Sequence, residues 1–86
     1  MKVKDNKIYT YIEDGKLQIE RIMQDYSNYI KTIIINSYIN LSSEDMEEVL
    51  LDVFVVLWKN QNKLDINKSL SKYISGVTKN LIKYKE

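Results

Sequence analysis

Residues 42–60 read SSEDMEEVLLDVFVVLWKN and carry the clearest helical signal in the chain. Ser42 or Ser43 can cap this helix, and the acidic residues that follow are favoured by the positive end of the helix dipole. An apolar face then recurs at helical spacing. It consists of Met46, Val49, Leu50, Val53, Phe54 and Leu57. We therefore predict a helix over residues 43–60 that packs into a core.

The same stretch has a second apolar stripe. Leu51, Val55 and Trp58 follow one another at i, i+4 and i+7, and Glu48 and Asp52 lie one turn apart beside them. An apolar strip with an acidic rim is typical of a protein interface. The acids would equally serve as helix caps and solvated surface, and a large aromatic such as Trp58 usually fills a core. Both interpretations stay open at this point.

Two further helices are expected before this stretch. Residues 17–39 carry apolar side chains at spacings of three and four. They are Leu17, Ile19, Ile22, Met23, Tyr26, Ile30, Ile33 and Ile34, with Ser37 continuing the row. Residues 5–13 can form a short helix with Ile8, Tyr9 and Ile12 on one side, ended by Asp14-Gly15, because Gly accepts the left-handed conformation of a helix C-terminus.

A last helix is expected over residues 68–85, after a polar connection. Asn67 or Ser69 can cap it. The side chains expected to point inward are Leu70, Tyr73, Ile74, Val77, Leu81 and Tyr84. Gly76 inside this helix costs roughly 1 kcal/mol relative to Ala, and we expect the close approach of another helix to be the reason.

Composition supports an all-α fold in one domain. The 86 residues are 44% hydrophobic, contain no Pro and only two Gly, and leave room for one modest core. We expect residues 1–86 to form a single domain, a compact bundle of three main helices plus a short N-terminal helix.

Composition also argues against an enzyme. The chain has no Cys and no His, which removes disulfides, thiolate metal sites and the commonest general base. We expect no catalytic residues, no cofactor and no metal. No apolar run is long enough to span a membrane, and the N-terminal residues lack the apolar stretch of a secretory signal, so we expect a cytoplasmic protein.

The sign of the charge changes between the last two predicted helices. Residues 40–58 hold five acids and no Lys or Arg, whereas residues 59–86 hold seven Lys and two acids, so the two segments carry −5 and +5. Neighbouring surfaces of opposite sign suggest two different partners. Tyr73, Asn80 and Tyr84 are interleaved with the lysines, which favours single-stranded nucleic acid, although surface lysines often serve only solubility.

The order of these motifs resembles region 2 of the bacterial sigma factors, especially the extracytoplasmic-function group. Residues 45–58 (DMEEVLLDVFVVLW) are similar to that family's D-A-E-D-L-V-Q-E-V-F-L-R-L-W, Lys63-Leu64-Asp65 looks like its R-F-D, and residues 70–80 (LSKYISGVTKN) resemble F-R-A-W-L-Y-R-I-A-R-N. Upstream, residues 12–16 and Tyr26 fall where the family tends to have a Gly-Asp turn and a helix with a central Tyr.

The resemblance implies a transcription initiation module. It would dock on the clamp helices of the β′ subunit of core RNA polymerase and open promoter DNA at the minus-ten element. By this likeness the polymerase-binding residues would be Glu48, Leu51, Asp52 and Val55. The residues that hold the unwound strand would be Lys68, Ser69, Lys72, Tyr73, Lys79, Asn80 and Lys83. An anti-sigma factor is a further partner that the family suggests.

The chain departs from the family pattern at several positions. The family's Gln is Leu51, its Trp in the last helix is Tyr73, and most of its Arg positions are Lys or apolar. Because Lys lacks the planar bidentate contacts of Arg, we expect sequence readout to be relaxed or carried by other residues. Two other functions stay open: a small helical domain that dimerises weakly through Leu51, Val55 and Trp58, or a non-specific binder of single-stranded nucleic acid.

Overall fold

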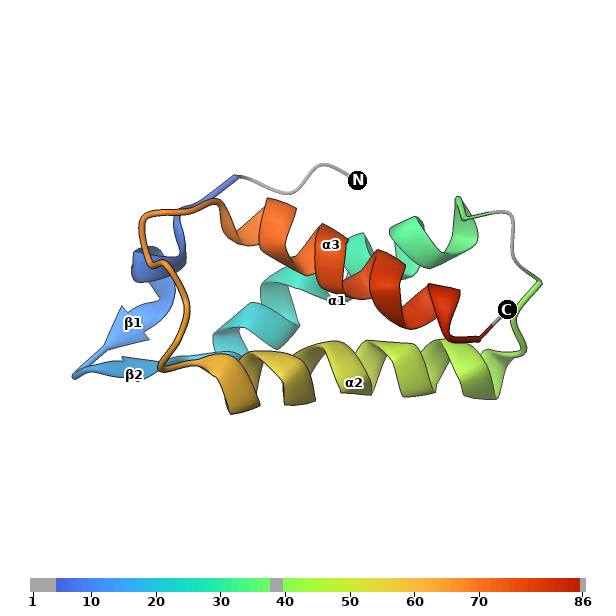
Figure 1. The fold of residues 1–86 in the computed structure, drawn as a ribbon, viewed down its shortest axis with the longest axis horizontal. Coiled ribbons are helices and arrows are strands. Elements are labelled where there is room, and N and C mark those ends of the chain that lie inside the picture. Colours follow the sequence, from blue (N-terminus) through green and yellow to red (C-terminus); the bar gives the residue numbers. More distant parts are fainter. Residues whose placement is uncertain (1–4, 38–39, 86) are drawn as a thin grey trace.

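Three α-helices make up most of the structure, a computed structural model that describes residues 5–37 and 40–85. They are α1 (Ile19–Ile35), α2 (Ser43–Asn60) and α3 (Leu70–Lys83). Each helix packs against the other two (Figure 1), and one cluster of buried side chains fills the space between them. The predicted all-α bundle of three main helices is confirmed.

The helix ends follow local capping signals. Ser42 caps α2 by accepting a hydrogen bond from the Asp45 backbone N–H at 3.1 Å, and Ser69 caps α3 by accepting one from Lys72 at 3.2 Å. Helix α2 has the predicted bounds, whereas α3 is two residues shorter at each end than the predicted range 68–85. Helix α1 begins two residues later than predicted and ends at Ile35; positions 38 and 39, expected in this helix, lie outside the described residues.

The N-terminal segment differs from the predicted helix over residues 5–13. A single 3-10 turn, η1 (Ile8–Tyr11), is followed by a hairpin of β1 (Ile12–Glu13) and β2 (Lys16–Leu17). Asp14 and Gly15 have φ values of 53° and 75°, and two consecutive positive φ values form the tight turn that suits a hairpin. The Asp-Gly pair was therefore a hairpin signal, and its interpretation as a helix end was wrong.

The same segment turns different side chains inward from those predicted. Ile8 is buried, but Tyr9 is 53% exposed and Tyr11 takes the inward place. The Tyr11 hydroxyl donates a hydrogen bond to Asp25 Oδ2 at 2.6 Å, and its ring meets Tyr26 edge-on. The contacts of Tyr11 with Asp25 and Tyr26 thus hold η1 against α1.

The predicted inward faces of the helices are largely confirmed. Buried side chains on α1 are Ile22, Tyr26, Ile30 and Ile34, and those on α2 are Val49, Leu50, Val53, Phe54 and Leu57. On α3 the buried row is Leu70, Ile74, Thr78 and Ile82, while Tyr73, Val77 and Leu81 are half-buried against the core. Tyr84 is 86% exposed, so its predicted inward place is wrong.

Thr78 enters the core because its hydroxyl has a local partner. It donates to the carbonyl of Ile74 at 2.7 Å, one turn earlier in α3. A buried hydroxyl with such a partner avoids the cost of an unmet hydrogen bond.

Gly76 lies on the exposed side of α3, contrary to the expectation of a close helix contact. A Cβ atom added there would have no neighbour within 4 Å beyond its own helix and adjoining residues. The packing of the described residues therefore gives no reason for Gly at this position.

The N-terminal segment also holds the connection between α2 and α3 (Figure 1). The backbone N–H groups of Ile8 and Tyr9 donate to the carbonyls of Lys68 and Ile66, both at 3.0 Å, and the Leu70 N–H donates to Asn6 at 2.9 Å. These bonds place the start of α3 against residues 6–9, far away in the sequence.

Candidate functional site

The outward face of α2 exposes three large apolar side chains, Leu51, Val55 and Trp58, which we call the α2 strip. They are 56%, 45% and 61% exposed, on the side of the helix opposite the buried Val53 and Leu57. No other described residue covers them enough to bury them. The predicted second stripe is thus a surface feature, and Trp58 does not fill the core.

Acidic side chains lie at the N-terminal end of the α2 strip and along one flank. Asp52 is half-buried on that flank and makes no ion pair with any residue in the described ranges. Glu48 instead binds the Lys85 ammonium group, and this hydrogen bond raises the pKa of Lys85 above its ordinary value. Among the four expected polymerase contacts, Leu51, Val55 and Asp52 are therefore available, while Glu48 is already paired within the chain.

The outward face of α3 has the opposite character. Lys72, Lys79, Asn80 and Lys83 are all exposed and follow one another at helical spacing, with Gly76 among them. We call these four side chains the α3 stripe. Helix α3 itself contains no acidic residue, so the stripe presents a run of positive charge with one amide, and the Asp5 carboxylate lies near Lys72 at its start.

Tyr73 and Lys68 lie apart from this stripe. They border a cavity of about 250 Å³ between α3, the end of α2 and the connection, whose other lining residues are Ile8, Asn60, Lys63, Leu64 and Asp65. Tyr73 is half-buried there, and burial raises the pKa of its hydroxyl. The expected nucleic-acid residues thus divide into a stripe along α3 and a hollow at its start.

Ser69 does not belong to either group. Its side chain is only 9% exposed, and its hydroxyl both caps α3 and donates to the Asp5 carboxylate. Ser71 donates to the same Asp5 oxygen at 2.9 Å, and these two hydrogen bonds hold the pKa of Asp5 below its ordinary value. The structure gives Ser69 a folding role and little exposed surface, and its contact with a DNA strand stays a prediction.

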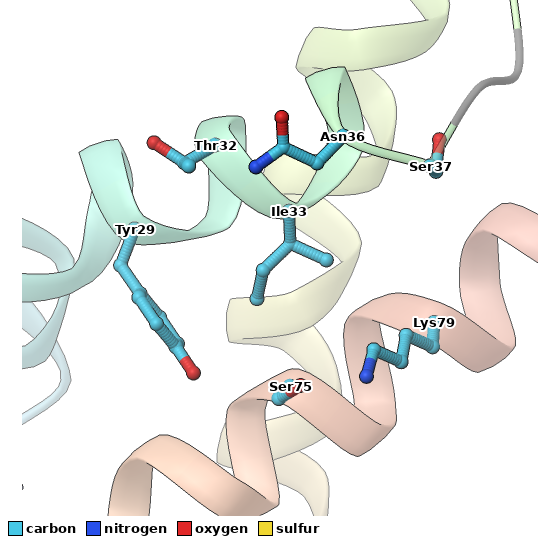
Figure 2. A pocket seen from close by; sticks show the side chains of 7 residues that line it. All are labelled: Tyr29, Thr32, Ile33, Asn36, Ser37, Ser75 and Lys79. Atoms are coloured by element: carbon cyan, nitrogen blue, oxygen red, sulfur yellow. The ribbon is translucent and has the colours of Figure 1, made fainter.

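A larger cavity, of about 580 Å³, lies between α1 and α3 (Figure 2). Sequence reasoning missed it, although Lys79 was already a candidate residue. Its lining residues are Tyr29, Thr32, Ile33, Asn36, Ser37, Ser75 and Lys79. The two walls come from segments some forty residues apart, and no local pattern indicates that they face each other.

Across residues 5–37 and 40–85, no three or more carboxylates come together in a way that could hold a metal ion. No helix in this part of the chain combines the length and apolar character needed to cross a bilayer.

No family model, curated protein or solved structure matches the chain. The likeness to sigma region 2 therefore rests on the sequence motifs alone.

Proposed function

We propose that this domain is a transcription initiation module of the sigma region 2 type. It binds bacterial core RNA polymerase through the α2 strip and Asp52. It engages single-stranded minus-ten promoter DNA through the α3 stripe and the cavity that Tyr73 and Lys68 border. The main support is the exposure of Leu51, Val55 and Trp58, which leaves an apolar surface without a partner among residues 5–37 and 40–85.

The α2 strip suits a helical partner with polar or basic flanks. Three large apolar side chains on one helix face can pack against another helix, and burying them removes their apolar surface from water. Asp52 lies at the edge, where a partially desolvated carboxylate pairs well with Arg or Lys. By the family likeness, Leu51, Asp52 and Val55 stand at polymerase-contact positions.

The α3 side suits a single strand more than a smooth duplex. Lysines along the α3 stripe can hold successive phosphates, while the hollow beside Tyr73 offers an aromatic ring and an apolar lining to an unstacked base. Removing a base from its stack costs a few kcal/mol, which such a hollow must offset by stacking and hydrogen bonds.

The test is retention of this domain by purified bacterial core RNA polymerase. We expect the wild type to be retained and Leu51→Asp or Asp52→Arg to weaken binding roughly tenfold or more, because each places an unfavourable charge in the contact. Glu20→Arg is the matched control for Asp52→Arg: it makes the same change of charge at an exposed position on α1. Circular dichroism should show that all variants are folded.

Equal retention of wild type, Asp52→Arg and Leu51→Asp would refute polymerase binding through α2. So would absence of retention for a folded wild type. Equal affinity for minus-ten and scrambled strands in the presence of polymerase would instead favour a non-specific single-strand binder, whose binding should fall steeply with salt.

Self-association is the second candidate function, because the same exposed α2 strip can pair with a second copy. Sedimentation equilibrium distinguishes the two. A dimer that dissociates in Leu51→Asp, with no polymerase retention, would replace the first proposal, whereas a monomer at high concentration would remove the second.

A further inference from the structure

The cavity between α1 and α3 has an apolar base and a polar rim. Figure 2 shows Tyr29 and Ile33 directed from α1 toward α3, and the Lys79 ammonium end turned toward Ser75. A volume of about 580 Å³ lies within the range of small-molecule sites, roughly 300 to 1,000 Å³. The space is therefore adequate for a ligand with at least one ring.

The aromatic wall of this cavity is held in place by the core. The Tyr29 ring meets the buried Tyr26 edge-on, with centroids 5.9 Å apart and an interplanar angle of 80°. The Tyr29 hydroxyl donates to the carbonyl of Ser71 at 3.4 Å. A wall that is already ordered costs little conformational entropy when a ligand binds.

Three polar groups at the rim have no partner among the described residues. The side chains of Asn36, Ser75 and Lys79 make no hydrogen bond or ion pair with the residues in ranges 5–37 and 40–85. One of them is a cation, and no carboxylate lines the cavity. Its charge and its free donors therefore match an anion.

We propose that the α1–α3 cavity binds a small organic acid, with the carboxylate against Lys79 and the apolar body against Ile33 and Tyr29. Ser75 lies beside Lys79 and can donate to the second carboxylate oxygen. Asn36, at the opposite wall, can hydrogen-bond a polar group on the body of the ligand.

The orientation of the acid follows from the dipole of α1. Asn36 and Ser37 follow the last turn of α1, where carbonyl groups carry partial negative charge. A carboxylate is repelled from that end and is favoured at the α3 wall. Lys79 and Ser75 are both on this wall.

A carboxylate fits the site better than a phosphate ester does. A phosphate brings about 1.5 to 2 negative charges and three oxygens, and proteins often meet it with backbone N–H groups at a helix N-terminus. Here the walls are the second half of α1 and the middle of α3, where N–H groups are already bonded within the helices. One ammonium group and one hydroxyl match two oxygens and a single charge.

An acid bound in the cavity would compete with nucleic acid for the ammonium group of Lys79. Lys79 belongs to the α3 stripe, so a carboxylate at its ammonium group lowers the positive charge offered to a strand. This consequence rests on the proposed function, whereas binding to the cavity does not.

The binding test uses 3-phenylpropionate as the probe and its neutral amide, 3-phenylpropanamide, as the matched ligand. In two-dimensional NMR of the whole labelled chain, we expect the acid to shift amide signals of residues 29–37 and 75–79, with a dissociation constant of the order of 1 mM. The amide should bind roughly fivefold more weakly, because it lacks the charge that pairs with Lys79.

Two variants separate the cavity from general surface charge. Lys79→Met should lower the affinity for the acid to the affinity for the amide. Lys83→Met removes an exposed α3 lysine outside the cavity and should leave the fivefold preference for the acid unchanged. Absence of shifts in the two lining segments, equal affinity for acid and amide, or a retained preference in Lys79→Met would each overturn the proposal.

A second arm measures a fluorescent single-stranded oligonucleotide with and without saturating 3-phenylpropionate. The acid should weaken DNA binding by the wild type roughly twofold to fivefold and have no effect on Lys79→Met. If the acid binds the cavity and DNA affinity is unchanged, the coupling is refuted. If the oligonucleotide never binds, the proposed function loses its DNA contact while the cavity result stands.

Discussion

Helices α2 and α3 are alike on the inside and opposite on the outside. Each buries a row of side chains at helical spacing in the shared core, yet α2 exposes Leu51, Val55 and Trp58 whereas α3 exposes lysines around Gly76. The inward rows determine the bundle, and the outward rows are free to serve partners. Substitutions on the two sides should therefore separate stability from binding.

The largest expected effect is on the inside of α2. Leu57→Ala should lower the free energy of unfolding by about 2 to 5 kcal/mol, because the side chain is fully buried and its removal leaves a cavity. Leu51→Ala, the same change on the outward face, should alter it by about 0.5 kcal/mol or less. Urea unfolding followed by circular dichroism measures both. Similar losses for the two variants would mean that Leu51 is buried in solution.

The second-largest effects concern the N-caps of α2 and α3. Removing them should lower the free energy of unfolding by different amounts. Ser42→Ala removes only the cap of α2 and should cost about 1 kcal/mol. Ser69→Ala removes the cap of α3 and also a partner of Asp5, so we expect a larger loss, about 2 kcal/mol.

Ser71→Ala is the control for the Ser69 comparison. It removes a hydrogen bond to Asp5 and leaves the cap in place. Equal unfolding free energies for Ser42→Ala and Ser69→Ala would show that the contact with Asp5 adds nothing to the cap.

Gly76 gives an effect of opposite sign. Gly76→Ala should raise the free energy of unfolding by about 0.5 to 1 kcal/mol, since Ala suits a helix interior and the added methyl meets no neighbour. If a DNA strand passes close to the α3 stripe, the Gly76→Ala variant should bind DNA more weakly despite being more stable. A thermal melt and a DNA titration give the two values, and a more stable protein with unchanged DNA affinity would place the strand away from Gly76.

The smallest expected effect concerns pH. The pKa of Asp5 is lowered in the folded chain by hydrogen bonds from Ser69 and Ser71. A lowered folded pKa adds stability above the unfolded value, near 3.8, and this contribution is lost as the pH falls through the folded pKa. The wild type should thus be more stable than Asp5→Asn at pH 6, and the difference should shrink below pH 4. A difference independent of pH would mean that the charge of Asp5 does not matter.

Local patterns in the sequence determined the three main helices and much of the surface. Helical spacing identified the buried rows of α1 and α2, and serine caps identified the starts of α2 and α3, because these signals act between residues three or four apart. The second apolar stripe of α2 is also visible in the sequence, but the sequence leaves open whether Trp58 fills the core or lies at the surface, and the structure exposes it. The expectation for Tyr84 failed because α3 ends at Lys83, so Tyr84 lies beyond the last helical turn, and the buried row of the helix ends at Ile82 on another side.

Only the tertiary structure decided the remaining features. The Asp14-Gly15 pair fits both a helix end and a hairpin, and the structure places it in the turn between β1 and β2. Residues 6–9, just before this hairpin, pair with residues 66–70. Ser69 is withdrawn from the surface by Asp5, a residue 64 positions earlier. The α1–α3 cavity needs Tyr29 and Ile33 to face Lys79 across the bundle. Such contacts depend on how distant segments pack together, and residue spacing along one helix carries no information about them.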